Sequence, residues 1–347
     1  MMKLQEPQLR QRGRASIDFL GLIGGATAPL RVAVDGELVE RQVTAGSLPE
    51  DMDARYDTVN AALRDSRANA TLTLLGDWHG RSHGKFAVQA FEEIAEDLKP
   101  VMAAAETGPA KLTLDPDLVP PDYWDGVEFH RTSPGWDGHE HMGFVHGEII
   151  HRKMVDRMYP GGIFKQRRAV AGMAPLPHYD RILDMGCSSG HFTAALTDAF
   201  PQARITGVDL SRRMLEHAWR TANVNGWDWD LYQRPMEDTG FAEASFDLVT
   251  SYIILHEMPA HAIRASFAEA LRLLVPGGDM VMSDVTRYAD LDRLAAWKAD
   301  RLAKFGGEPF WRESASLDLA ELAREVGFAE AKAEGIYPHV LIARKAA

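Results

Sequence analysis

The chain has 347 residues, and its 38 basic and 50 acidic side chains give a net charge of −12. This length suffices for a large core and favours two structural units. The acidic balance argues against a nucleic acid or an anionic membrane surface as the default partner. The single cysteine, Cys187, excludes an internal disulfide and any metal site built from several cysteines.

Near the N-terminus, three arginines precede the apolar stretch 19–30. Asp18 and several glycines make this stretch a poor secretion signal. No stretch approaches the roughly 20 apolar residues that a membrane span requires. We therefore expect a cytoplasmic protein without a membrane partner.

The first part of the chain, residues 1–164, carries no motif of known function. Asp35-Gly36 between two apolar runs predicts a β-hairpin over 30–43. Helical patterns follow over 49–66 and 86–105, with a polar loop over 76–84 between them. We expect a mostly helical accessory domain that helps dimerise the protein or covers a site.

A loop-rich section over 114–143, followed by a predicted helix over 147–159, is the best candidate for a substrate lid. It is rich in prolines, aromatic residues and histidines. Aromatic and imidazole groups together suit a planar, partly polar organic molecule. The alternative is that the aromatic residues only pack the loop onto its domain. The candidate substrate-binding residues are Tyr123, Trp124, His130, Trp136, His139 and His146.

Three histidines of this section, His139, His141 and His146, suggest a metal site as an alternative. Gly138 and Gly143 indicate a loop rather than a strand, and no carboxylate motif completes the set. The sequence therefore predicts no metal.

A nucleotide-type turn lies at Ile182 to Gly190, with the sequence Ile-Leu-Asp-Met-Gly-Cys-Ser-Ser-Gly. An apolar strand runs into small residues that let a ligand approach the backbone, and a helix follows over 191–200. Asp209 ends a second apolar strand, where an acidic side chain would meet a ribose. Together these features resemble the class I S-adenosylmethionine (SAM) dependent methyltransferases.

The resemblance continues through further strands and helices over about 165–347. Strands are expected before Met236, over 245–251, over 279–283 and over 340–343, and Pro276-Gly277-Gly278 is expected to stop a helix before the third of these. The resemblance implies an α/β fold with a Rossmann-like doubly wound sheet, the seven-stranded methyltransferase core, over 165–347. The accessory domain would be 1–164.

By this resemblance the cofactor is S-adenosyl-L-methionine. The residues expected to bind it are Asp184, Gly186, Cys187, Ser188, Gly190, Asp209, Leu210, Met214, Met236, Glu237 and Ser251. Two positions depart from the family pattern. Ser188 replaces a glycine, which is tolerable if its backbone torsion φ is not positive. Pro235 stands where many relatives carry an acid for the adenine amino group, and proline cannot take that role through its side chain.

The segment after the strand over 245–251 is expected to face the methyl donor, because ligands bind beyond the carboxyl ends of parallel strands. His256 is the leading candidate for a general base, since an unperturbed imidazole is largely neutral at cytoplasmic pH. The alternative is that His256 only shapes the pocket. The weaker catalytic candidates are Glu257, His261, Asp284 and Tyr252. Arg167-Arg168 are expected on a solvated helix face.

The function that follows is transfer of a methyl group from SAM to oxygen or carbon of a small, planar or aromatic substrate. A second copy of the chain, in a homodimer, is the partner expected besides the substrate. Two alternatives stay open. One is a SAM-binding enzyme that catalyses a rearrangement or decarboxylation, and the other is a non-catalytic SAM-binding scaffold. The identity of the product would distinguish them.

Overall fold

A computed structural model of the protein describes residues 7–159 and 161–347. Its centre is one eight-stranded sheet in the order β1-β4-β3-β2-β5-β6-β8-β7. The strands are β1 Lys111–Thr113, β2 Arg181–Met185, β3 Arg204–Asp209, β4 Asp230–Gln233, β5 Phe246–Tyr252, β6 Leu274–Asp284, β7 Glu330–Glu334 and β8 His339–Arg344. All neighbouring pairs are parallel except those of β8, which is antiparallel to both β6 and β7.

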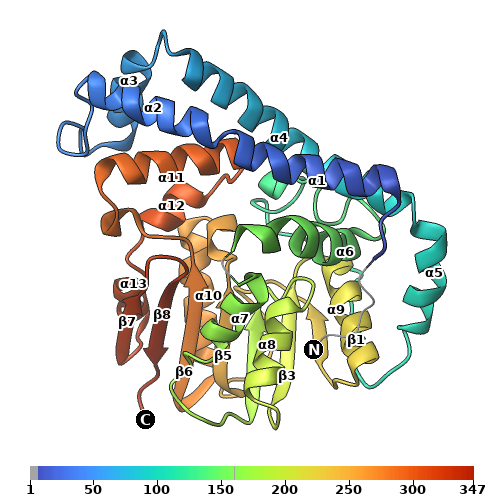
Figure 1. The fold of residues 1–347 in the computed structure, drawn as a ribbon. Helices are drawn as coiled ribbons and strands as arrows, with labels where there is room; N and C mark the ends of the chain where they lie inside the picture. Colours follow the sequence, from blue (N-terminus) through green and yellow to red (C-terminus); the bar gives the residue numbers. More distant parts are fainter. Residues whose placement is uncertain (1–6, 160) are drawn as a thin grey trace.

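Helices cover both faces of this sheet (Figure 1). The α-helices are α1 Gln11–Ala26, α2 Ala28–Glu40, α3 Met52–Ala62, α4 Arg67–Glu92, α5 Ala95–Ala104, α6 Met142–Phe144, α7 Ile163–Ala171, α8 His191–Ala199, α9 Arg212–Asn225, α10 Ala260–Leu273, α11 Arg293–Gly306, α12 Trp311–Ser316 and α13 Leu319–Val326. The 3₁₀-helices are η1 Phe129–Arg131, η3 Asp156–Met158, η4 Leu255–Glu257 and η5 Tyr288–Asp290, and η2 Val145–Val155 is a π-helix.

The alternation of side chains along β2 shows how the core is divided. Ile182 packs with Leu196 of α8 and Leu215 of α9, whereas its neighbour Leu183 packs with Phe267 of α10 on the opposite face. Successive residues of a strand point to opposite faces, so both faces of β2 are buried. This confirms the predicted doubly wound α/β fold, with β1 as an eighth strand beside the expected seven.

The N-terminal helices form a layer over one end of the sheet. Figure 1 shows α1, α2 and α4 crossing that end, with α11 and α12 directly beneath them. Trp297 of α11 is buried in one cluster with Val34 and Leu38 of α2 and Val59 of α3. The predicted division at residue 164 stays a prediction, and the two segments share both this cluster and, through β1 and β4, the sheet.

Two local predictions in the N-terminal part are wrong. The region of the predicted hairpin is α2, because Pro29 suits a first helical turn and the four-residue spacing of Val34 and Leu38 buries one helical stripe. The predicted loop over 76–84 is part of α4. Its glycines permit close packing: a Cβ on Gly84 would lie 3.0 Å from the backbone of Thr132. The loop after η1 therefore rests directly on α4.

Other boundaries also differ from expectation. Pro276-Gly277-Gly278 lies inside β6, where the pairing of β5 with β6 shifts register, so these residues form a strand irregularity rather than a stop before the strand.

The expectation that no segment is long and apolar enough to span a membrane is also wrong. Gln11–Glu40 meets that criterion by length and composition alone. In this fold, the same segment packs on α4.

Candidate functional site

The turn between β2 and α8 places two carboxylates beside a bend of the backbone. Asp209 at the end of β3 accepts hydrogen bonds from the backbone N–H groups of Ser188 and Ser211, each at 2.8 Å. Asp184 in β2 is fully buried and accepts a bond from the Thr193 hydroxyl at 2.7 Å. Burial raises the pKa of each aspartate to about 7.

Ser188 adopts a left-handed conformation, with φ of +48°. Serine was expected to be tolerated here only if φ is not positive. This condition is not met. A side chain in this region costs on the order of 1 kcal/mol. The conformation directs the Ser188 N–H toward Asp209, and this hydrogen bond offsets part of the cost.

A cavity opens beside this turn, at the carboxyl ends of β2, β3 and β5. Four of its lining residues belong to the predicted cofactor set: Gly186, Asp209, Leu210 and Met236. The others are Tyr123, Trp124, Arg234, Ile254, Glu257 and Met258. Ten residues from segments far apart in the chain thus surround one space, and we call it the cofactor cavity.

The remaining cofactor candidates do not line the cavity. Cys187 in the turn and Ser251 in β5 are buried, and burial raises the pKa of the Cys187 thiol well above its usual range. Glu237 accepts a hydrogen bond from the Tyr123 hydroxyl. Met214 packs in the apolar cluster of the N-terminal part. For Gly190, a Cβ would lie 2.9 Å from Trp229, so its smallness serves packing. Their cofactor roles stay predictions.

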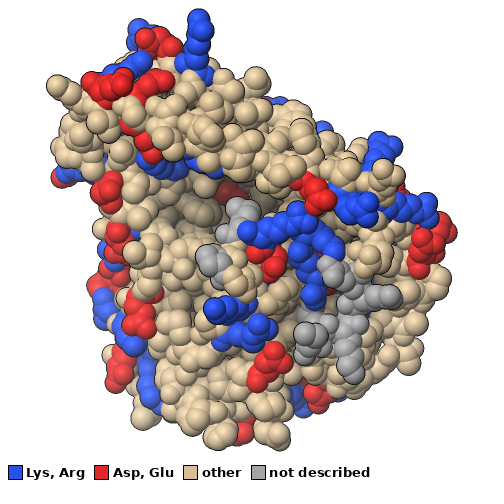
Figure 2. All heavy atoms as spheres, viewed as in Figure 1, with Lys and Arg blue, Asp and Glu red and all other residues tan. Residues whose placement is uncertain are grey.

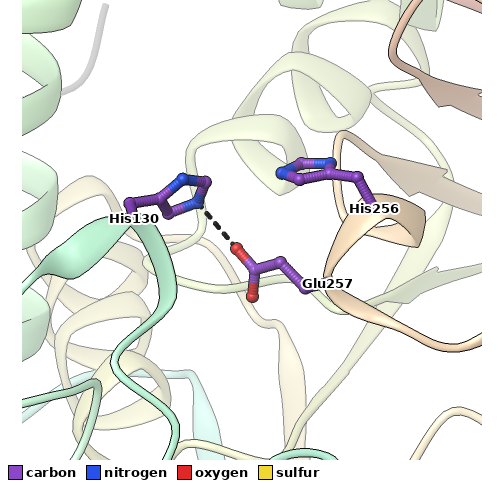
Figure 3. Close-up of side chains that lie close together, drawn as sticks. All are labelled: His130, His256 and Glu257. Atoms are coloured by element: carbon purple, nitrogen blue, oxygen red, sulfur yellow. Dashed lines mark hydrogen bonds and ion pairs between the residues drawn. The ribbon is translucent and has the colours of Figure 1, made fainter. Parts of the chain in front are cut away.

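Two histidines and three carboxylates meet next to the cofactor cavity. The Nδ1 atom of His256 lies 3.0 Å from Oδ1 of Asp284, and Nε2 of His130 lies 2.8 Å from Oε1 of Glu257 (Figure 3). Nδ1 of His130 is hydrogen-bonded to Oε1 of Glu308. We call His130, His256, Glu257, Asp284 and Glu308 the histidine–carboxylate cluster.

The carboxylates set the protonation of both imidazoles. Burial lowers the pKa of His256, but Asp284, Glu308 and Glu257 together more than offset this, so the net shift is upward rather than absent as expected. Burial likewise lowers the pKa of His130, and Glu308 and Glu257 together raise it well above its usual range. Burial raises the pKa of Glu308, and the neighbouring His130 reverses that shift to a net lowering.

The catalytic candidates divide into two groups. His256 and Glu257 share the cluster, and Glu257 also lines the cofactor cavity. Tyr252 is not brought to them: its hydroxyl donates to Gln166 at 2.6 Å, and its ring stacks on Phe192 with centroids 4.9 Å apart. Burial raises the Tyr252 pKa to about 12. The base role of His256 stays a prediction.

Most of the predicted substrate residues converge on the same place. Tyr123 and Trp124 line the cofactor cavity, and the Trp136 indole N–H donates to Oε2 of Glu257 at 3.3 Å. The ring of His146 lies 4.7 Å from that of Trp136. His139 is the exception, because its Nε2 pairs with Glu92 of α4 at 2.7 Å. As predicted, the section over 114–143 is mostly irregular.

The histidines first considered for a metal do not converge, since His139 pairs with Glu92 and His146 lies against Trp136. Among the described residues, the side chains that bring three donor atoms within 4.8 Å of one another are His130, His256 and Glu257. Two of the three follow β5 directly, and the third comes from the lid.

Sequence reasoning missed Glu308 and misplaced Arg167. Glu308 follows α11 and carried no signal. Arg167 was expected in solvent but is 4 % exposed. Its Nε and Nη1 atoms have no hydrogen-bond partner, and its Nη2 lies 3.5 Å from Nδ1 of His151. The spacing of Ile163, Arg167, Val170 and Ala171 places Arg167 on the buried stripe of α7, and this pattern could have revealed it.

Comparisons with known proteins agree with this geometry. A family described as "Methyltransferase domain" matches residues 182–278. The ubiquinone/menaquinone biosynthesis C-methyltransferase of Desulfotalea psychrophila is 30 % identical over 182 residues, which cover 47 % of this chain and 72 % of that protein. The malonyl-[acyl-carrier protein] O-methyltransferase of Hahella chejuensis is 32 % identical, over 45 % of this chain and 53 % of its own length.

Other matches are more distant. The trans-aconitate 2-methyltransferase of Azoarcus sp. is 26 % identical, again over 45 % of this chain and 53 % of that protein. The chain thus spans about half the length of these last two curated relatives. Among solved structures, phosphoethanolamine N-methyltransferase 2 of Haemonchus contortus, in complex with S-adenosyl-L-methionine, matches 67 % of this chain and 61 % of its own with a TM-score of 0.49 and 16 % identity.

Proposed function

Because the chain belongs to the SAM-dependent methyltransferases of class I, we propose that it methylates an oxygen or carbon atom of a small, planar and partly polar organic molecule. In this reaction the bond between sulfur and the methyl carbon breaks, a bond from that carbon to the acceptor forms, and the acceptor loses a proton. The cofactor already supplies an electrophilic methyl group, so the protein must position the acceptor and help remove its proton.

One observation carries the proposal: Glu257 lines the same cavity as Gly186 and Asp209 and is hydrogen-bonded to His130 of the lid. A carboxylate and an imidazole, which are both acid–base groups, therefore lie beside the space predicted for the cofactor. A C-methyltransferase and an O-methyltransferase among the relatives support carbon or oxygen as the acceptor atom.

The aromatic wall of the cavity supports the planar shape proposed for the substrate. Tyr123 and Trp124 offer ring faces, and Trp136 packs behind them against His130 with ring centroids 5.6 Å apart. Figure 2 shows that the surface is hollowed below the N-terminal helices, with Lys and Arg side chains gathered beside the hollow. The net charge of −12 supports a small molecule rather than a nucleic acid as partner. A cytoplasmic homodimer completes the proposal.

The test uses SAM with a trideuterated methyl group and a panel of hydroxylated aromatic and enolisable carbonyl compounds. We expect one panel member to gain one labelled methyl group while S-adenosylhomocysteine accumulates, as measured by mass spectrometry. Asp209→Ala, which is expected to weaken cofactor binding, is the negative control. Conversion of a substrate without uptake of label would instead support a rearrangement or decarboxylation.

A further inference from the structure

The histidine–carboxylate cluster presents two imidazoles in the same arrangement. A carboxylate can only accept, so Nδ1 of His256 carries a proton toward Asp284, and Nδ1 of His130 carries one toward Glu308. Each carboxylate therefore fixes its ring and directs Nε2 at the other members. Nε2 of His130 also donates to Glu257 in this structure, and a metal ion that binds there would displace that proton. A carboxylate behind a histidine is the usual support for a histidine that binds a metal.

An unpartnered oxygen faces the same space. The Glu308 side chain is 7 % exposed, and its Oε2 has no hydrogen-bond partner. It lies 3.9 Å from Nε2 of His256, which is too far for a hydrogen bond. Oε1 of the same carboxylate holds Nδ1 of His130, so Glu308 lies behind this ring and adds negative charge beside the cluster.

The backbone at His130 is held in a costly conformation. His130 and Arg131 have φ of +55° and +51°, and such strain persists only where the surroundings enforce it. The glycines of α4 supply part of that enforcement, because a Cβ on Gly80 would lie 3.0 Å from the Phe305 carbonyl oxygen and one on Gly84 would meet Thr132. The result is an imidazole held between Glu257 and Glu308.

The net charge of the cluster also favours binding of a cation. Three carboxylates face two imidazoles, and the ion-pair partners of Glu257 and Glu308 are these two imidazoles. Even with both rings protonated, the five groups together carry a net negative charge. Placing such a charge away from water is costly unless it is compensated.

We infer that the histidine–carboxylate cluster binds a divalent transition-metal cation. Its ligands are Nε2 of His130, Nε2 of His256 and a carboxylate oxygen of Glu257. Glu308 supports the His130 ring from behind, through Nδ1. Mixed imidazole and carboxylate ligands suit Zn²⁺, Mn²⁺ or Fe²⁺ rather than the oxygen-only cations Mg²⁺ and Ca²⁺.

The use of this cation rests on the proposed function. Since Glu257 also lines the cofactor cavity, an oxygen of the acceptor can join the cation as a further ligand. The cation lowers the pKa of that hydroxyl or enol, the proton leaves to water, and the oxygen or the conjugated carbon takes the methyl group from sulfur. His256 is then a metal ligand and not the general base predicted from the sequence. The bound cation takes over that role, because it promotes loss of the proton from the acceptor.

The test measures metal binding without cofactor or substrate. The full chain is treated with a chelator, dialysed and titrated with Zn²⁺ or Mn²⁺ in a calorimeter, and the untreated protein is analysed for its metal content. We expect about one equivalent to bind. His130→Ala and Glu257→Gln should weaken binding at least about tenfold, whereas His178→Ala, which removes an exposed histidine outside the cluster, should leave it unchanged.

Glu308→Gln keeps the size of the side chain and guards against a folding defect, which thermal melting of each variant also checks. It too should weaken binding at least about tenfold. Absence of stoichiometric binding, or equal affinity in wild type and all three cluster variants, would overturn the inference. So would a metal-free enzyme that methylates at the full rate. Metal binding without any methylated product would instead count against the proposed function alone.

Discussion

The turn between β2 and α8, which we call the cofactor turn, and the histidine–carboxylate cluster meet at one cavity, the cluster through Glu257. The two regions are assembled differently. Gly186, Ser188 and Asp209 lie within two adjacent strand ends, and backbone hydrogen bonds hold them together. His130, Glu257 and Glu308 come from the lid, from the segment after β5 and from the loop after α11. The first region depends on local chain geometry, and the second depends on how three distant segments pack.

This difference indicates which kind of change disrupts each region. A change of backbone conformation affects the turn, whereas a loss of packing between the N-terminal layer and α11 affects the cluster. The predictions below separate these two dependencies.

The largest effect is expected from removing residues 1–150. This deletion takes β1 from β4 and uncovers Trp297. A buried tryptophan hides roughly 200 Å², which at about 25 cal/mol per Å² contributes about 5 kcal/mol, a large share of a typical stability. We expect the fragment not to unfold cooperatively in a thermal melt. A cooperative fragment that binds SAM would show that the turn does not need the N-terminal layer.

The next effect concerns Asp209→Ala. A carboxylate that accepts bonds from ribose hydroxyls contributes on the order of 1.5 to 3 kcal/mol, so SAM affinity should fall at least about tenfold in calorimetry. The matched control is Asp228→Ala, which removes an exposed aspartate outside the cavity. Unchanged affinity for Asp209→Ala would remove Asp209 from the cofactor site.

The pH dependence of SAM binding should report the same carboxylate. Burial raises the pKa of Asp209 to about 7, so the side chain is ionised above that pH and neutral below it. If the ionised form binds the ribose, affinity is full above pH 7 and falls up to about tenfold per unit as the pH drops below it. Calorimetry from pH 5.5 to pH 8.5, chosen to bracket that pKa by about 1.5 units, tests this. Asp209→Asn should remove the contribution of Asp209 and leave only that of Asp184, whose pKa is also about 7.

The smallest effect is expected for Ser188→Gly. Glycine adopts positive φ without the strain that a Cβ causes, so the substitution should raise the free energy of unfolding by up to about 1 kcal/mol. Chemical denaturation measures it. SAM affinity should stay unchanged, because the backbone N–H remains directed at Asp209. A loss of stability would mean that the Ser188 side chain makes contacts that outweigh its backbone strain.

The same contrast explains what the sequence predicts well. The strands around Asp184, Asp209 and Ser251 follow from apolar runs and their spacing, and the structure has them within a few residues of the expected places. A motif of this kind is local, because a strand, a tight turn and a helix start encode its geometry. The lid residues Tyr123 and Trp124 also lie at the cavity.

What the sequence does not predict depends on distant contacts. The glycines of α4 resemble loop residues, but Gly84 is needed because Thr132 packs against it. Glu308 gains its importance only because folding places it against His130, 178 positions earlier in the chain. The spacing of Arg167 along α7 is that of a buried position, but its charge favours the prediction of a solvated one. None of these contacts has a signature within a short stretch of sequence.

The late position of Glu308 has a consequence for the order in which the protein is made. A ribosome releases the segment from β2 to β3 about a hundred residues before Glu308, so this segment can begin to fold before α11 is synthesised. The cluster cannot close until α11 and the loop after it have emerged. A nascent chain thus has the strands around the turn before it has the second set of chemical groups.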